Sequence, residues 1–323
     1  MKIKTIGIVG TGFIADDFIK KLNPNIAKVI AVFGINQIQA KKFARKHGIA
    51  CTQSLEELMQ KSEVDMIYVG VPNQAHYEVM IAALSYKKHI LCEKVFTLNS
   101  KQLQHIEELA KNNNCVVIEG MTLFYMPLFH LVKKYIQEGY LGDITMLSIS
   151  FGSCKEANPA NRFFSLEKGG GALFDIGTYA LSAALMLMRT SPRLLQTSVK
   201  KFKTGVDDTS GIILQNDDKE MAVISLSFRG KLPKQVIVSG SLGYIVISDF
   251  PRATKAMVFH NDGNCKKLSV GNDQMVYDYE VQYMQDILQN KQTFCSFALT
   301  KKVIELMDDI RKLWGLSYPG EDE

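Results

Sequence analysis

The residues best placed to do chemistry begin at position 10, where residues 10–15 (GTGFIA) follow a strand-like run and open a helical pattern. Gly10 permits a tight turn there, Gly12 lets the backbone approach a pyrophosphate, and Ala15 keeps the helix close to the sheet. The start of such a helix supplies free N–H groups and the positive end of its dipole. Glycine turns also occur for steric reasons alone, but this position between a strand and a helix predicts dinucleotide binding.

The end of the second predicted strand should distinguish NAD from NADP, because an acidic residue there holds the ribose hydroxyls and an arginine accommodates a 2′-phosphate. The chain has Gly34, Ile35 and Asn36 at this point, and so has neither group. Asn36 is a candidate partner for a ribose hydroxyl, and Lys41 for a 2′-phosphate. Both are explained equally well as loop and helix surface, so the cofactor is predicted as NAD or NADP.

Oxidation of an alcohol by a nicotinamide also needs a group that takes the hydroxyl proton. Lys94 lies just past the C-terminal end of a predicted strand, where doubly wound sheets bind their ligands. Asp175 and Tyr179 are four positions apart on a predicted helix over residues 173–188, so their side chains share a face. Tyr179 is a candidate proton relay, Lys94 would bind the same substrate oxygen, and Asp175 would orient Lys94 or the substrate. A surface lysine, a helix-start aspartate and a core tyrosine are the structural alternatives.

The first third of the chain predicts the scaffold that positions these groups. Predicted strands cover residues 3–9, 28–33, 65–70, 89–92 and 115–119, and predicted helices cover residues 13–22, 37–46, 75–86 and 100–111. Another helix begins at Ser54, which forms a capping box with Glu57. Strands that alternate with helices form a parallel, doubly wound sheet, so the fold class is α/β and residues 1–122 are predicted as an NAD(P)-binding Rossmann domain.

The pattern changes after residue 122. Helical patterns cover residues 127–138, 173–188, 276–289 and 300–313, and short alternating runs lie between residues 194 and 259. Turn signals such as Val206-Asp207-Asp208 separate these runs, which predicts consecutive antiparallel strands. Residues 123–323 are therefore expected to form an α+β domain for substrate binding and oligomerisation, with a largely antiparallel open sheet. Runs 221–228 and 235–238 carry apolar residues at both alternating positions, which predicts a homodimer or a dimer of dimers through the open face.

Composition argues against several other classes of protein. The 323 residues, 46% hydrophobic and 22% charged, are typical of a folded chain with two domains. The net charge of +5 comes without a basic cluster, so we expect no nucleic-acid partner. We also expect no membrane span and no signal peptide, since no apolar run reaches about 18 residues and the N-terminus reads as a strand. Six scattered cysteines without a C-x-x-C pair indicate a reduced, cytoplasmic protein without a metal site.

Further motifs give the chain a resemblance to a known family. Residues 71–77 read VPNQAHY, 88–94 read KHILCEK, 139–144 read GYLGDI and 169–179 read GGGALFDIGTY. Together with Glu119, Pro127 and the glycine turn, they resemble the Gfo/Idh/MocA family of nicotinamide-dependent oxidoreductases, and its dihydrodiol and xylose dehydrogenase branch in particular. The resemblance implies that Lys94, Asp175 and Tyr179 are catalytic. The cofactor contacts that we expect are Gly10, Gly12, Phe13, Ile14, Asn36, Pro72, Asn73, His76, Glu93 and Lys94.

The chain departs from the family pattern at two places. Val95 replaces the proline of the E-K-P motif, so we expect a looser backbone after Lys94. Phe124 and Met126 stand where the family often has arginine and histidine, which removes polar groups that would hold a sugar. Phe124 and Arg162 are the substrate contacts that we expect, Arg162 for an anionic or polar group.

The function predicted from the sequence is hydride transfer between a nicotinamide and a secondary alcohol or carbonyl of a small polyol, sugar or cyclic diol. One alternative is a dinucleotide-sensing regulator without turnover, because a fold does not determine a function. Another is an imine- or tetrapyrrole-type reductase, which the apolar departures favour. Retention of Lys94, Asp175 and Tyr179 together favours the dehydrogenase or reductase.

Overall fold

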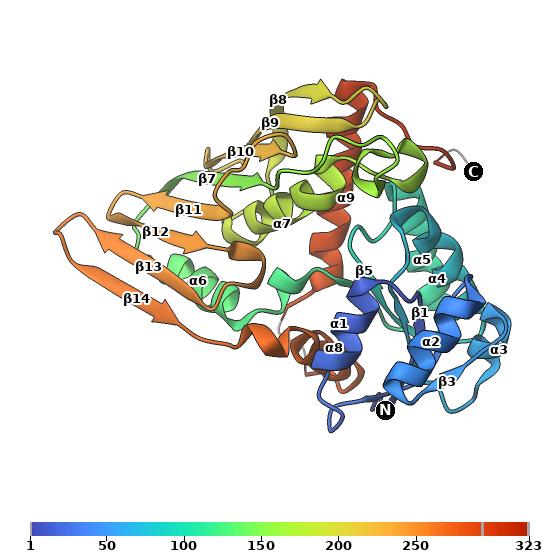
Figure 1. The fold of residues 1–323 in the computed structure, drawn as a ribbon. Coiled ribbons are helices and arrows are strands. Elements are labelled where there is room, and N and C mark those ends of the chain that lie inside the picture. The colour runs from blue at the N-terminus through green and yellow to red at the C-terminus, as the bar shows by residue number, and fades with distance from the viewer. Residues whose placement is uncertain (1, 292–293, 322–323) are drawn as a thin grey trace. The chain divides into compact units, whose positions relative to one another are not determined.

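A computed structural model describes residues 2–291 and 294–321, and the chain forms two compact units. Unit 1 comprises Met1–Met121 and Gln274–Phe297, and unit 2 comprises Thr122–Asp273 and Ala298–Glu323 (Figure 1). The first break lies one residue from the predicted boundary. Residues 274–297, which we had expected in the second domain, belong to unit 1.

Unit 1 contains the predicted Rossmann sheet. Its six strands are parallel and lie in the order β3-β2-β1-β4-β5-β6. The strands are β1 (Thr5–Val9), β2 (Lys28–Phe33), β3 (Ala50–Cys51), β4 (Met66–Val69), β5 (His89–Glu93) and β6 (Val117–Gly120). The helices between them are α1 (Phe13–Lys21), α2 (Gln37–His47), α3 (Leu55–Gln60), α4 (His76–Ser85) and α5 (Ser100–Asn112). The order reverses at β1 and β4, which is where doubly wound sheets bind dinucleotides.

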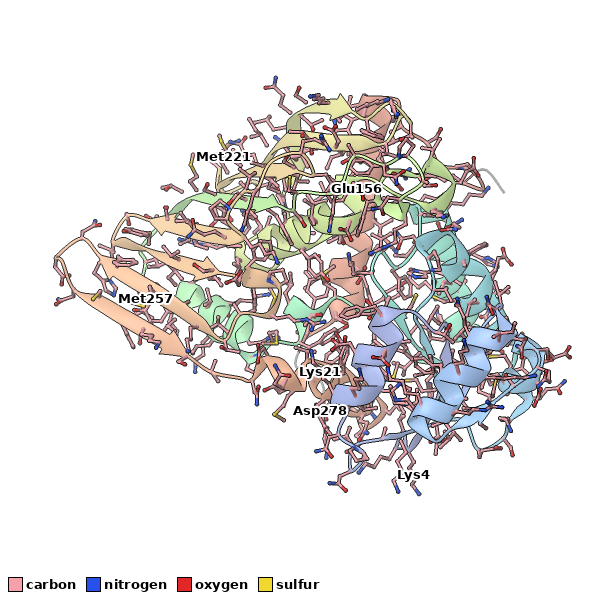
Figure 2. The ribbon with its side chains drawn as sticks, viewed as in Figure 1. Lys4, Lys21, Glu156, Met221, Met257 and Asp278 are labelled. Carbon is pink, nitrogen blue, oxygen red and sulfur yellow. The ribbon has the colours of Figure 1, made fainter. Side chains whose placement is uncertain are left out.

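Helix α8 (Val276–Leu288) returns to unit 1 because its polar side chains bind that unit's backbone and helices. Tyr277 donates its hydroxyl to Asp17 at 2.9 Å and packs edge-on against Phe18. Gln285 donates its amide to the carbonyl oxygens of Ile3 and Ile26. Figure 2 marks the same region with Lys21 at the end of α1 and Asp278 in the first turn of α8.

Unit 2 is built on an eight-stranded sheet in the order β14-β13-β12-β11-β7-β10-β9-β8. Its strands are β7 (Ile144–Gly152), β8 (Arg193–Lys201), β9 (Asp207–Gln215), β10 (Met221–Ser227), β11 (Gln235–Gly240), β12 (Gly243–Ser248), β13 (Lys255–His260) and β14 (Cys265–Ser269). All neighbours are antiparallel except β7 and β10. The predicted run of consecutive strands is therefore wrong at the centre, where β7 lies between β10 and β11.

Helices cover one face of this sheet. They are α6 (Pro127–Gln137), α7 (Thr178–Leu187), which follows a π-helical turn over Leu173–Gly177, and α9 (Ser296–Trp314). Helix α7 packs on β7 and α6 packs on α7. Residues on the helix side of the strands, such as Ile224 and Val238, are fully buried, whereas Met221 and Met257 on the other side are half-buried (Figure 2).

One segment of unit 2 is long and apolar enough to pass for a membrane span. Residues Leu166–Leu187 meet that criterion, contrary to our expectation that no segment would. However, 89% of the qualifying window is buried inside the protein, as in the central helix of a water-soluble core. We therefore interpret the segment as core.

Candidate functional site

The turn after β1 has the geometry that a pyrophosphate needs. Gly10 has φ of +110°, and a side chain on it would overlap the carbonyl of Gly70. A Cβ on Gly12 would meet no described atom within 4 Å, so the space beside this residue is open. Gly12 also caps α1 without a side-chain hydrogen bond, which leaves the first N–H groups of the helix for a ligand. Both predicted glycine roles therefore fit a bound dinucleotide.

The remaining residues of the turn differ in exposure. Phe13 is 84% exposed, Ile14 is half-buried, and Ala15 is fully buried, as expected for close packing of the helix on the sheet. The exposed ring of Phe13 lies at the mouth of a hollow of about 370 Å³ between α1 and α2. The hollow adjoins the glycine turn, since Thr11 and Gly12 are among its lining residues.

The charged residues that line this hollow are two lysines and one aspartate. Its lining residues are Thr11, Gly12, Phe13, Asp16, Gln39, Lys42, Phe43 and Lys46. Asp16 is paired with Lys20 at 2.5 Å, with Lys46 and with His47 at 2.8 Å, and the hydrogen bonds from Lys20 and Lys46 hold the pKa of Asp16 well below its usual range. Lys42 makes no ion pair with any residue that the structure describes. The hollow therefore presents a net positive charge.

Asn36 is an exposed residue whose side-chain oxygen is already committed. It caps α2 by accepting a hydrogen bond from the Gln39 N–H at 3.1 Å. The amide nitrogen of Asn36 is the group that remains to donate to a ribose oxygen. Lys41, the residue predicted to reach a 2′-phosphate, is exposed but does not line the hollow, whereas its neighbour Lys42 does.

His76, one of the expected cofactor contacts, lies against two backbone carbonyl groups. It is fully buried, and its two ring nitrogens lie 2.7 Å from the Val95 carbonyl and 2.9 Å from the Val71 carbonyl. Burial lowers the pKa of His76. The imidazole thus lies between the loop after β4 and the loop after β5, and its single N–H in the neutral form donates to one of these two carbonyl oxygens.

The loop after β5 holds the predicted catalytic lysine. Glu93 accepts a hydrogen bond from the Tyr68 hydroxyl at 2.5 Å, and Tyr68 stacks on Phe18 in the core. Lys94 follows at the edge of the sheet and is half-buried. Val95 is fully buried, its carbonyl faces His76, and the Lys94–Val95 peptide is cis. The looser backbone that we expect after Lys94 stays a prediction.

Pro72 and Asn73 begin the short turn that leads into α4. Pro72 is exposed and precedes a 3₁₀ turn over Asn73–Ala75, and Asn73 is half-buried. Both residues follow β4 directly, and β4 is the strand next to β1. The structure thus brings Gly10, Pro72 and Lys94 to the same edge of the sheet, since the carboxyl ends of parallel strands share an edge.

In unit 2, the two predicted catalytic residues lie on one buried helical segment. Asp175 belongs to the π-helical turn and Tyr179 to α7. Both are half-buried, whereas the residues between them are fully buried. The Tyr179 ring lies 6.2 Å from that of Phe151 on β7. These two side chains are therefore the partly accessible ones on this stretch, as a shared face predicts.

The two candidate substrate residues differ from each other. Arg162 is exposed, and its guanidinium stacks 4.3 Å from the centre of the Phe163 ring. Phe124 is fully buried and packs edge-on against Tyr125, which is the environment of a core residue. Contact of either residue with a substrate stays a prediction.

Asp207 is the most prominent group in unit 2 that the sequence analysis missed. We interpreted it as part of a turn, but it begins β9, is fully buried, and accepts the Leu173 N–H at 2.7 Å. Burial raises the pKa of its carboxyl to about 7. No local pattern in the sequence indicated this role, because the contact joins residues 34 positions apart.

The chain is similar to several characterised proteins along almost its whole length. It is 28% identical to trans-1,2-dihydrobenzene-1,2-diol dehydrogenase of Xenopus tropicalis, over 97% of this chain and 98% of the relative. It is 27% identical to scyllo-inositol 2-dehydrogenase (NADP(+)) of Bacillus subtilis, with coverage of 97% and 98%.

Solved structures share the fold. A 3-ketoreductase of Actinomadura kijaniata, in complex with NADP and TDP-benzene, superposes with a TM-score of 0.86 at 20% identity, and covers 96% of this chain and 98% of its own. Levoglucosan dehydrogenase, in complex with NADH and levoglucosan, gives a TM-score of 0.85 at 19% identity, with coverage of 97% of both chains.

Two family domains match in the order that the motifs predict. Residues 4–121 match the oxidoreductase family with an NAD-binding Rossmann fold, and residues 129–246 match the GFO/IDH/MocA C-terminal domain. The glycine turn, the lysine after β5 and the helix with Asp175 and Tyr179 are thus explained together: the chain belongs to the GFO/IDH/MocA family of oxidoreductases.

Proposed function

We propose that the protein transfers a hydride between NADP(H) and a secondary alcohol or carbonyl of a small polyol, sugar or cyclic diol. The observation that carries the proposal is the turn of Gly10 and Gly12, which leaves room and N–H donors for a pyrophosphate at the same edge of the sheet as the half-buried Lys94. Its relatives of similar length are named as dehydrogenases of a cyclic diol and of an inositol, which supports this substrate class. A sensor without turnover would not need the lysine and tyrosine.

Each residue has a separate role in the proposed hydride transfer. A bound nicotinamide supplies the hydride acceptor or donor. Tyr179 takes the proton from the substrate hydroxyl as the carbon–hydrogen bond breaks, and returns it in the reverse direction. In this proposal the Lys94 ammonium binds the same substrate oxygen, and a positive charge at that oxygen favours the phenolate form of Tyr179. Asp175, one turn before Tyr179, orients these groups.

The choice of NADP(H) rests on the hollow beside the glycine turn. The end of β2 offers no carboxylate to repel a 2′-phosphate. Lys42 lines the hollow without an ion pair among the described residues, and Asp16 is neutralised by its basic neighbours. An ammonium near a phosphate favours binding by direct charge attraction. Lys42 is therefore the group that we assign to the 2′-phosphate.

We further propose that two copies associate through the open face of the sheet in unit 2. Ile237, Val246 and Met257 are neighbours across β11, β12 and β13 on this face. Tyr244 is 41% exposed and stacks on Phe259 at 4.9 Å. A contiguous apolar patch of this kind is typical of an interface.

Titration of the purified protein with NADPH and with NADH tests the cofactor proposal. Lys42→Met should weaken NADPH binding by about tenfold, the loss of one charge-assisted contact, while NADH binding changes little. Lys41→Met is the matched control, since it removes the same charge one position away from the hollow. Equal affinity for both nucleotides in the parent would contradict the assignment of Lys42.

A panel of polyols, aldoses and cyclic diols, followed by absorbance of the reduced nicotinamide, then tests the reaction. Turnover with at least one secondary alcohol or its ketone is expected. Nucleotide binding without turnover on any of them would favour the sensing alternative.

A further inference from the structure

The catalytic helix of unit 2 begins inside the protein core, where its first N–H groups lack water. Ala172 and Leu173 are fully buried, and Ala172 at the N-cap makes no side-chain cap. The first N–H groups of a helix have no partner within the helix, and leaving them unsatisfied in a core is costly. Another part of the chain must therefore supply the acceptor.

Asp207 supplies it from the sheet. Its Oδ2 atom accepts the Leu173 N–H at 2.7 Å. Asp207 begins β9, which is hydrogen-bonded to β8 and β10 along its length. The hydrogen bond from Leu173 to Asp207 thus attaches the start of the helix to the sheet.

Gly171 is shaped for this contact. Its φ is +113°, and a Cβ on it would overlap the Oδ1 atom of Asp207. Only a residue without a side chain lets the carboxyl approach the helix start so closely. Gly171 and Asp207 therefore act together, because the missing side chain of Gly171 makes room for the carboxyl that caps the helix.

A second contact holds the same turn from the C-terminal segment. The Tyr318 hydroxyl donates to the Gly170 carbonyl at 2.5 Å, and its ring stacks on that of Phe174 at 4.7 Å. The Arg311 guanidinium lies 5.4 Å from the Tyr318 ring. The backbone from Gly170 to Phe174 is thus held at the Leu173 N–H, at the Gly170 carbonyl and at the Phe174 ring.

We propose that Asp207 is a positioning residue, whose side-chain oxygen sets the start of the helix and thereby the places of Asp175 and Tyr179. Asp175 lies two residues beyond the N–H that Asp207 accepts, and Tyr179 lies six residues beyond it. A proton relay loses rate steeply when its atoms move by about 1 Å. The inference rests on the proposed function for its catalytic consequence, but not for its structural one.

The acceptor oxygen of Asp207, rather than its charge, holds the start of the helix in place. Burial raises the pKa of Asp207 to about 7, so both protonation states occur near neutral pH, and each keeps an acceptor oxygen. The groups that face this carboxyl are Asp208 on its own strand and Tyr318 from the C-terminal segment. Asp207→Asn keeps the acceptor oxygen, whereas Asp207→Ala removes it. The two variants therefore separate a role of the oxygen from a role of the charge.

The test compares these variants by hydrogen–deuterium exchange and by kinetics. Asp207→Ala should increase exchange of residues 172–179 by about tenfold or more, and lower kcat about tenfold with KM and the cofactor Kd within about twofold. Asp207→Asn should restore most of both. Asp208→Ala is the matched control: it is a neighbouring, buried aspartate (3% exposed), and it should destabilise unit 2 while leaving kcat nearly unchanged.

If Asp207→Ala does not fold, Asp207→Leu gives the same comparison with the volume filled. Unchanged exchange in residues 172–179, or an equal loss of kcat in Asp208→Ala, would overturn the proposal. A parent protein without nucleotide binding or turnover would instead overturn the proposed function, and the exchange measurement would still decide the role of Asp207.

Discussion

The buried carboxyl of Asp207 predicts how the stability of unit 2 depends on pH. Its pKa is raised from 3.8 to about 7 in the folded protein, first because burial disfavours the charge and then because Asp208 lies nearby. The folded state therefore holds its proton at pH values where the unfolded chain has lost it. The contribution of Asp207 to stability is greatest below about pH 4, falls as the pH rises, and is constant above about pH 7.

The size of this loss follows from the shift. At about 1.4 kcal/mol per pKa unit, the whole change is about 4 kcal/mol. About 3 kcal/mol of it falls between pH 5 and pH 8, because the unfolded carboxyl is already largely ionised at pH 5. Asp207→Asn has no carboxyl that titrates at this position. The free energy of unfolding of this variant should therefore not show the loss that Asp207 causes between pH 5 and pH 8.

The single tryptophan offers the assay. Trp314 is 7% exposed, belongs to unit 2, and donates its indole N–H to Thr197 at 3.1 Å. Urea unfolding followed by its fluorescence therefore reports on unit 2, without the ambiguity of a chain with two units. The difference in stability between the parent and Asp207→Asn should change by about 3 kcal/mol from pH 5 to pH 8, in favour of the variant at high pH. A difference that stays constant across this range would refute the reasoning.

Three further outcomes are expected. Gly12→Val should fold, as judged by circular dichroism, yet bind NADPH at least about 100-fold more weakly in a fluorescence titration, since its side chain fills the open space beside the turn; parental affinity would contradict the pyrophosphate assignment. Lys94→Met and Tyr179→Phe should each lower kcat on the order of 10²-fold, with the double variant little worse and Asp175→Asn milder, because groups that act as a unit are not additive; near-parental turnover in Tyr179→Phe would return that residue to the core. Light scattering at micromolar protein should give a dimer or a larger closed assembly, and Ile237→Lys on the open face should shift it toward the monomer; a monomeric parent would exclude this interface.

The α/β fold was predictable because its signals are periodic and local. The alternation of apolar strands and amphipathic helices located every long element of the parallel sheet, and Ser54 caps α3 by accepting the Glu57 N–H as the capping box predicts. The strand β3 escaped notice because two residues, Ala50 and Cys51, carry no period. The central strand β7 was not among the predicted strands, and residues 139–144 were interpreted only as a G-x-x-G turn.

The parts of the site that could not be predicted depend on contacts between distant residues. His76 was expected as a cofactor contact, and its ring nitrogens lie against two carbonyls from separate loops. Asp207 looked like a turn residue, because aspartate pairs are common in turns. Its role became visible only when the fold brought it to the buried end of a helix 34 positions earlier. A local pattern records the propensity of a residue, whereas the partner that satisfies a buried polar group comes from the tertiary fold.

The return of α8 to the Rossmann unit has a consequence for how such a chain can be divided. The backbone passes from one unit to the other after residues 121, 273 and 297, so neither unit is a continuous stretch of sequence. A fragment that ends near residue 121 would lack the α8 side chains of Tyr277 and Gln285, and would expose the surface of α1 and the carbonyls that they cover. Exchange of nucleotide-binding units between relatives, by recombination in nature or by design, would therefore succeed only if residues 274–297 travel with the N-terminal segment.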